Sequence, residues 1–158
     1  MSSFLNLRGG CLCGAVRYEV TSEPLILYAC HCTDCQTASG ASFVLAMVIK
    51  PDSIAVIGGE PKSYERPRSD GRKKNIVRCP NCLTALWGVR PDGPNVATLY
   101  AGTLDDTSSL EPVAHIWTRS RQPWIQIPPN SLNFDRQPTD VLALVEASKS
   151  RSPGGSAA

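Results

Sequence analysis

The sequence lacks several features that would assign it to a common class of protein. No stretch of its 158 residues approaches ~18 consecutive apolar residues, so we expect no membrane span. The first ten residues lack the basic and then apolar segments of a signal peptide. Lys and Arg number 16 against 14 for Asp and Glu, too small an excess for a polybasic arm. We therefore expect a cytoplasmic protein with no membrane partner, and nucleic acid is an unfavoured partner.

Signals for long helices are also scarce. Glycine (12) and proline (13) together exceed their usual share, which favours many turns and short elements. Residues 15–20 alternate apolar and polar side chains, as a half-buried strand does. Further strand-like segments, separated by turn signals, lie at 25–29, 42–49, 53–57, 75–78, 85–89, 96–101 and 113–118. Many short strands in a chain of this size predict one mainly-β domain of antiparallel sheets.

Two short helices complete the predicted pattern. Residues 33–39 fit a helical turn or two. Pro138, Thr139 and Asp140 precede an apolar pattern at 141–145, which indicates an N-capped amphipathic helix near the C-terminal end. Residues 148–158 are small and polar, so we expect a single domain over 1–147 followed by a disordered tail.

Cysteine is the one residue type in clear excess, with seven copies. An odd number without a secretory context argues against a disulfide framework. Cys11-Leu-Cys13 and Cys79-Pro-Asn-Cys82 are tight loops next to predicted strands, and together they supply the four thiolates of a closed tetrahedral zinc site. Such a zinc would stabilise the fold directly. The alternatives are unrelated buried thiols, or a redox-active pair at Cys79 and Cys82.

The remaining cysteines form a second cluster, in which Cys30, Cys32 and Cys35 lie within six positions. Three protein ligands are the number that leaves a metal position open for water or substrate. A zinc with three thiolates has a net negative charge, so it suits a further thiolate better than an activated water. The cysteines thus predict two zinc ions per chain, one closed and one open.

Other readings of the second cluster are possible. Its three thiols could form a purely structural site completed by Asp34 or His115, or could bind an iron–sulfur cluster. His31 lies between two ligands and would point away from a metal that both bind, so we place it in the pocket or behind the ligands.

These motifs occur together in a characteristic order: Gly10-Cys11-Leu-Cys13-Gly14, Cys30-His31-Cys32-Thr-Asp-Cys35-Gln36, Cys79-Pro-Asn-Cys82, and His115-Ile-Trp117 with Pro123-Trp124. The combination resembles the glutathione-dependent formaldehyde-activating enzyme family, which includes centromere protein V. The resemblance covers roughly residues 9–137.

The resemblance implies a β-tent fold of antiparallel sheets with zinc knuckles. It implies a structural zinc on the four-cysteine group and a catalytic zinc on Cys30, Cys32 and Cys35. The implied activity is of the carbon–sulfur lyase type, S-(hydroxymethyl)glutathione synthesis, with the thiol of glutathione held at the open zinc while it condenses with formaldehyde. The residues expected to serve this reaction besides the zinc ligands are His31 as a catalytic group, and Gln36, His115 and Trp117 as substrate-binding groups.

One position departs from the family pattern. Leu83 follows the last cysteine, where the family usually has a glycine. A glycine suits a turn with positive φ, so a leucine there implies modest strain in the second knuckle.

Two other functions compete with the enzymatic one. The first is a non-catalytic, zinc-stabilised module that binds a protein or nucleic acid, which the basic segment 62–78 would support. That segment is otherwise expected to be a solvated hairpin, although its charges could receive the carboxylates of glutathione. The second is a redox or metal-buffering protein that uses the three exposed thiols.

Overall fold

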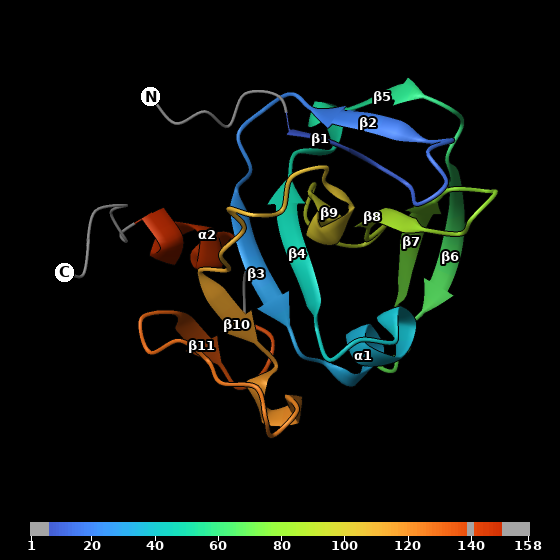
Figure 1. Cartoon of the computed structure of the whole chain (residues 1–158). Helices are drawn as coiled ribbons and strands as arrows, with labels where there is room; N and C mark the ends of the chain where they lie inside the picture. Colours follow the sequence, from blue (N-terminus) through green and yellow to red (C-terminus); the bar gives the residue numbers. More distant parts are fainter. Residues whose placement is uncertain (1–6, 139–140, 150–158) are drawn as a thin grey trace.

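The computed structural model describes residues 7–138 and 141–149 (Figure 1). The strands of this part of the chain are β1 (Leu7–Gly10), β2 (Arg17–Val20), β3 (Ile26–Cys30), β4 (Val44–Ile49), β5 (Ile54–Gly58), β6 (Lys62–Pro67), β7 (Lys73–Arg78), β8 (Ala85–Val89), β9 (Ala97–Tyr100), β10 (Ala114–Ile116) and β11 (Leu132–Phe134). The helices are α1 (Thr33–Ser39) and α2 (Val141–Lys149), with short 3-10 turns η1 (Pro51–Ser53), η2 (Ala101–Thr103) and η3 (Thr118–Ser120).

The strands form two sheets, which confirms the mainly-β prediction. Strands β1, β2 and β5 make a small antiparallel sheet, and the other eight follow the order β11-β10-β3-β4-β9-β8-β7-β6. The pairings are antiparallel as expected, except that β10 pairs in parallel with both β3 and β11. A parallel neighbour requires a long crossover, and the segment after β9 provides it.

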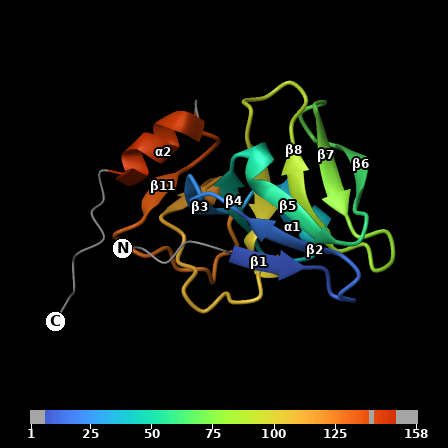
Figure 2. The same ribbon diagram turned by 90° about the horizontal axis from the view of Figure 1, so that it is seen from above.

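The large sheet curls strongly. Strands β3 and β7 are four places apart, which would separate them by ~19 Å in a flat sheet. Nevertheless Tyr28 on β3 and Lys74 on β7 line the same small hollow. Figure 1 shows β3 and β4 on one side and β6 and β7 on the other, with α1 at the lower end between them. Figure 2, seen from above, shows the β1–β2–β5 sheet crossing the opposite end.

Two apolar clusters account for the packing, and each contains one group of cysteines. The larger one joins Tyr18 of the small sheet to Met47 and Leu99 of the large sheet, and includes Cys11 and Cys79. The second lies under α2 and consists of Ile26, Cys30, Val48, Ala114, Ile116, Leu144 and Val145. Each cysteine loop is therefore packed against one of the apolar clusters through at least two of its group's cysteines.

The sequence located most elements and missed three strands. Helix α1 occupies the predicted residues 33–39, and α2 ends at Lys149, just beyond the predicted start of the tail at 148. Residues 150–158 of that tail and the capping residues 139 and 140 lie outside the described residues. The missed strands, β1, β6 and β11, have the sequences LRGG, KSYERP and LNF, which lack a clear alternation. No helix in the described ranges has the length and apolar character of a membrane span.

Candidate functional site

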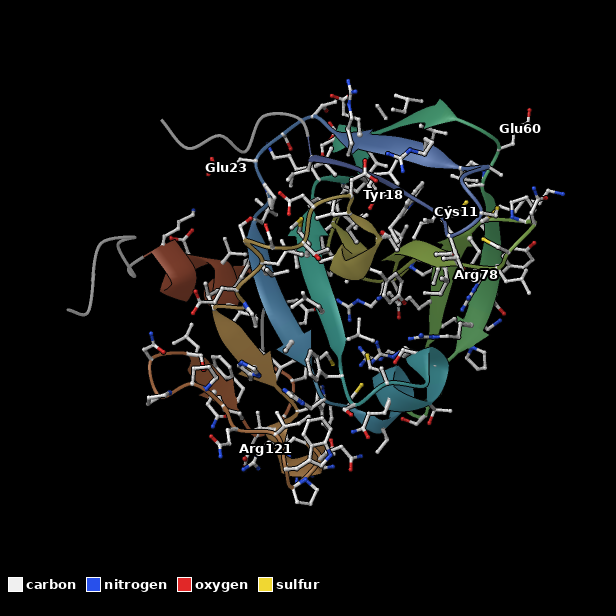
Figure 3. The ribbon with its side chains drawn as sticks, viewed as in Figure 1. Cys11, Tyr18, Glu23, Glu60, Arg78 and Arg121 are labelled. Atoms are coloured by element: carbon white, nitrogen blue, oxygen red, sulfur yellow. The ribbon has the colours of Figure 1, made fainter. Side chains whose placement is uncertain are left out.

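The first site is the four-cysteine group predicted from the two knuckle motifs. The sulfurs of Cys11, Cys13, Cys79 and Cys82 all lie within 4.8 Å of one another. Two of the separations are 3.5 Å (Cys11 Sγ to Cys13 Sγ) and 3.7 Å (Cys13 Sγ to Cys79 Sγ). Ligands at 2.3 Å around a tetrahedral zinc would be about 3.8 Å apart, so the thiol group fits such an ion. Figure 3 labels Cys11 at the upper end of the molecule.

The second knuckle has the backbone geometry that its sequence predicts. Leu83 has φ 61°, in the left-handed region that favours glycine. Its carbonyl accepts a hydrogen bond from Arg78 Nη1 at 2.8 Å, and its side chain is 58% exposed. The hydroxyl and backbone N–H of Thr84 lower the pKa of Cys82 to about 5, which favours the thiolate that a metal requires.

The second site is the three-cysteine loop, where β3 ends and α1 begins. Cys30 is the last residue of β3, and Cys32 caps α1 by accepting a hydrogen bond from the Cys35 N–H at 3.3 Å. The helix ends at Gly40, which has φ 65° and stops the helix in the left-handed conformation. A short capped helix after a strand therefore brings three sulfurs together from six consecutive positions.

Within the described residues this group consists of three cysteines and no fourth ligand. Neither alternative ligand joins it: Asp34 accepts a hydrogen bond from the Ser69 N–H at 3.1 Å, and His115 bonds to His31. The three thiols also affect one another's pKa values through hydrogen bonds. Hydrogen bonds with Cys30 and Cys35 lower the pKa of Cys32, while hydrogen bonds with Cys32 and Cys35 raise the pKa of Cys30.

His31 and His115 form a buried pair behind the cysteine loop. His31 Nε2 lies 2.9 Å from His115 Nδ1, the rings stack, and the residues are 0% and 5% exposed. Burial, followed by the nearby His115 and Arg121, lowers the pKa of His31 to about 4. Side chains alternate along a strand, so His115 points to the face of β10 opposite Ile116, which lines the hollow. The pair supports the loop from behind.

Gln36 connects the loop to the segment after β10. Its amide Nε2 donates to the carbonyls of His31 and Ser120, both at 2.8 Å, and its Oε1 accepts from Gln122 at 2.8 Å. The Ser120 hydroxyl also donates to the His31 carbonyl at 2.9 Å. Both N–H groups of the Gln36 amide are thus used within the protein, and its predicted substrate contact stays a prediction.

The three sulfurs open into a hollow of about 60 Å³ on the inner face of the curled sheet. Tyr28, Ala46 and Tyr100 stand side by side on β3, β4 and β9 and form part of its wall. Trp117 lies at the border with a second hollow of about 200 Å³, which both Cys32 and Arg68 also line. Of the predicted substrate-binding residues, Trp117 lines these hollows, whereas Gln36 and His115 lie outside their linings.

Three basic residues of the β6–β7 hairpin line the same hollow: Arg66, Arg68 and Lys74. They belong to the basic segment 62–78, which we expected to be chiefly a solvated hairpin. Lys74 Nζ lies 5.9 Å from the Tyr100 ring centre, and burial lowers the pKa of Lys74 to about 8. A Cβ at Gly88 would overlap the Lys74 side chain, so glycine makes room for it. The signal available in the sequence was the cluster of cations, but only the curl of the sheet shows where they point.

The fold and the two cysteine groups together define a mainly-β protein with one closed and one open cysteine group, each able to hold a metal ion. Residues 6–120 match the family of glutathione-dependent formaldehyde-activating enzymes, and the chain belongs to this family.

One relative agrees with this assignment, and one solved structure is similar in fold alone. A protein of Halomonas elongata that carries the provisional name of glutathione-dependent formaldehyde-activating enzyme is 30% identical over 126 residues, 77% of this chain and 80% of that protein. A crystal structure of a Rhodobacter sphaeroides protein is similar in fold, with a TM-score of 0.50 and 16% identity over 81% of this chain and 99% of the other.

Proposed function

We propose that this protein catalyses the condensation of glutathione with formaldehyde to S-(hydroxymethyl)glutathione, a carbon–sulfur lyase reaction run in the direction of synthesis. The observation that supports this proposal is the three-cysteine group at the wall of a hollow, with no fourth ligand from the described residues. The family name and that of the relative from Halomonas elongata supply the two reactants.

Cys30, Cys32 and Cys35 would hold a zinc ion, because three thiols within 4.8 Å match the soft donors that zinc prefers. When bound there, zinc supplies a position that takes up a further thiol as its thiolate. The group of Cys11, Cys13, Cys79 and Cys82 would hold the second, structural zinc. Its ligand set is complete, so its contribution is to stability rather than to chemistry.

In the reaction the glutathione sulfur forms a bond to the formaldehyde carbon, and the C=O π electrons move to the oxygen. The thiol proton is lost and the new hydroxyl gains a proton, so no oxidant or reductant is needed. The residues of the hollow bring the two reactants together, which lowers the entropic cost of an addition between two molecules. Trp117 borders the hollow and supplies an apolar wall for the glutathione backbone.

His31 and Gln36 support the cysteine loop from the side away from the hollow. His31 is neutral at pH 7 because burial lowers its pKa to about 4, and Gln36 fixes the carbonyl of His31. We assign both residues to holding the cysteine loop in position. His115 has the same role through its hydrogen bond to His31.

Two-dimensional exchange NMR tests the function directly. The rate of exchange between glutathione, formaldehyde and their adduct is measured without protein, with zinc-loaded protein and with zinc-loaded Cys32→Ala. We expect acceleration by the wild type alone, with two zinc ions bound to the wild type and one to the variant. An exchange rate equal to the protein-free rate, at two bound zinc ions, would contradict the proposal and favour the non-catalytic binding module.

A further inference from the structure

The β6–β7 hairpin places like charges directly opposite one another. Arg66 on β6 pairs with Lys74 on β7, and Lys62 pairs with Arg78. Such pairs share a face of the sheet and destabilise it, since like charges repel across neighbouring strands. Among the ion pairs of the described residues, none involves Arg66, Lys74 or Arg78. An arrangement that costs stability at a functional hollow points to an anionic ligand.

The hollow beside the cysteines does not stand alone. A third hollow, of about 280 Å³, adjoins it and shares Val44, Arg66 and Tyr100 with it. The hollow bordered by Trp117 adjoins it on the other side, through Cys32 and Arg68. The hollow of the three sulfurs therefore has lining residues in common with each of the other two, which have none in common with each other.

The two outer hollows differ in charge. The one shared with Arg66 contains a second arginine, Arg78, and its lining of described residues includes no acidic side chain. The one bordered by Trp117 contains Arg68 and Arg119 together with Asp34 and Asp70. The first is suited to a plain anion, whereas the second offers side chains of both signs, among which Arg68 and Asp70 are paired with each other at 3.0 Å. Figure 3 labels Arg78 on the side of the molecule where β7 lies.

Glutathione has the matching distribution of charge. Its thiol is in the middle residue, one end is a lone glycyl carboxylate, and the γ-glutamyl end carries a carboxylate and an ammonium group. An ammonium group needs an acidic or carbonyl partner, which the Arg66–Arg78 hollow does not offer from its side chains. An arginine fork matches a carboxylate in two hydrogen bonds.

We infer that the hollow lined by Arg66 and Arg78 binds the glycyl carboxylate of glutathione, while the γ-glutamyl end points to the hollow bordered by Trp117. The inference rests on the proposed function for the identity of the thiol. Arg66 is thus a specificity-determining residue that recognises the end of the substrate remote from the γ-glutamyl group. Arg78 contributes beside it, although one of its nitrogens is held by the Leu83 carbonyl.

The test compares two ligands on three zinc-loaded proteins by titration calorimetry, without formaldehyde. The ligands are glutathione and its glycyl monoethyl ester, which lacks only that negative charge. The proteins are the wild type, Arg66→Met and Lys73→Met. Lys73 lies on β7, the partner strand in the same hairpin, is exposed and pairs with Glu65, so its variant loses the same charge outside the hollow. Zinc content is measured before and after each titration.

We expect esterification to weaken binding to the wild type and to Lys73→Met by about tenfold, the value of one charge-assisted hydrogen bond. Arg66→Met should bind glutathione about tenfold more weakly than the wild type, and should no longer distinguish the two ligands. Equal affinity of the wild type for both ligands overturns the inference, even if Arg66→Met does not fold. An undiminished ester effect in Arg66→Met also overturns it, as does a failure of glutathione to bind.

The outcome is separable from that of the proposed reaction. Acceleration of exchange without an ester effect would support the proposed function and contradict the carboxylate subsite. An ester effect that depends on Arg66, without acceleration, would retain the subsite and remove the reaction.

Discussion

His31 Nε2 lies 2.9 Å from His115 Nδ1, in two stacked rings that are almost completely shielded from solvent. One ring nitrogen must donate and the other accept, so the bond exists only while at least one ring is neutral. The outer nitrogens, His31 Nδ1 and His115 Nε2, are buried without a partner among the described atoms. A proton added to either ring would therefore be buried without compensation.

This pair predicts a loss of stability in mild acid. Burial lowers the pKa of His31 to about 4, and the pKa of His115 is lowered as well, whereas both rings titrate near 6.5 when unfolded. The unfolded chain then binds more protons, so stability is full above pH ~6.5 and falls as the pH drops toward 4. The titration of His31 alone lowers the free energy of unfolding at pH 5 by about 2 kcal/mol, relative to its value well above pH ~6.5.

Urea unfolding of the wild type and of His115→Asn, at several pH values between 7.5 and 5 with zinc present, checks this. The asparagine keeps a polar atom near the Nδ1 position but does not titrate. We expect the variant to be less stable at pH 7.5 and to have a shallower pH dependence. Cysteine protonation on zinc release affects both proteins alike, so parallel curves would contradict the prediction.

A second prediction concerns the order in which the metal ions are lost. The four-cysteine group has its full ligand set, and Cys79 is 0% exposed within the larger core. The three-cysteine group has one ligand fewer and opens into a hollow. A chelator added in steps should remove one equivalent of zinc with little change in circular dichroism, and the second only with loss of structure. Simultaneous loss of both ions would contradict this order.

The third prediction is that Leu83→Gly stabilises the protein. Leu83 has φ 61°, which costs a non-glycine residue about 1–2 kcal/mol, while glycine adds about 0.5–1 kcal/mol of unfolded-state entropy. Its side chain is largely exposed, so its loss removes little packing. We expect a gain of about 0.5–1 kcal/mol in the free energy of unfolding of the zinc-loaded protein. Leu83→Ala retains the strain and serves as the control; equal effects of the two changes would refute the strain argument.

A fourth prediction separates support from substrate contact at Gln36. Gln36→Leu leaves the Ser120 carbonyl and the Gln122 amide without their partner, and should destabilise the protein by about 1–3 kcal/mol. Zinc affinity of the three-cysteine site should fall with it, because the loop loses its tie to η3. Gln126→Leu, at an exposed position, should change neither quantity. If Gln36→Leu instead weakens glutathione binding at unchanged stability and zinc affinity, the side chain contacts substrate as the sequence predicted.

The sequence predicted what depends on local spacing. Consecutive cysteines within each loop are at most three positions apart, so local spacing alone indicates that each loop can present its thiols together, and Thr33–Ser39 forms its helix where expected. The positive φ at Leu83 likewise follows from the knuckle turn alone.

What escaped prediction depends on contacts between distant segments. Arg66 and Lys74 reach the cysteines only because the sheet curls through four strand positions, which no local pattern encodes. Strand β1 ends in two glycines, yet it pairs with β2, and Gly9 lies against the ring of Tyr18, where a Cβ would overlap it. Strand β10 pairs in parallel with β3, a direction that hydrophobic alternation does not specify.

That parallel strand also orders events during synthesis. The four-cysteine group is complete once Cys82 has emerged, together with the small sheet and four of the eight strands of the larger one. The loop of Cys30, Cys32 and Cys35 has emerged even earlier, but the partners that hold it, the Ile116 carbonyl and Ser120, come much later. All four thiols of the closed cysteine group are thus present on the growing chain before the residues that hold the three-cysteine loop, whose contacts form only once β10 pairs with β3.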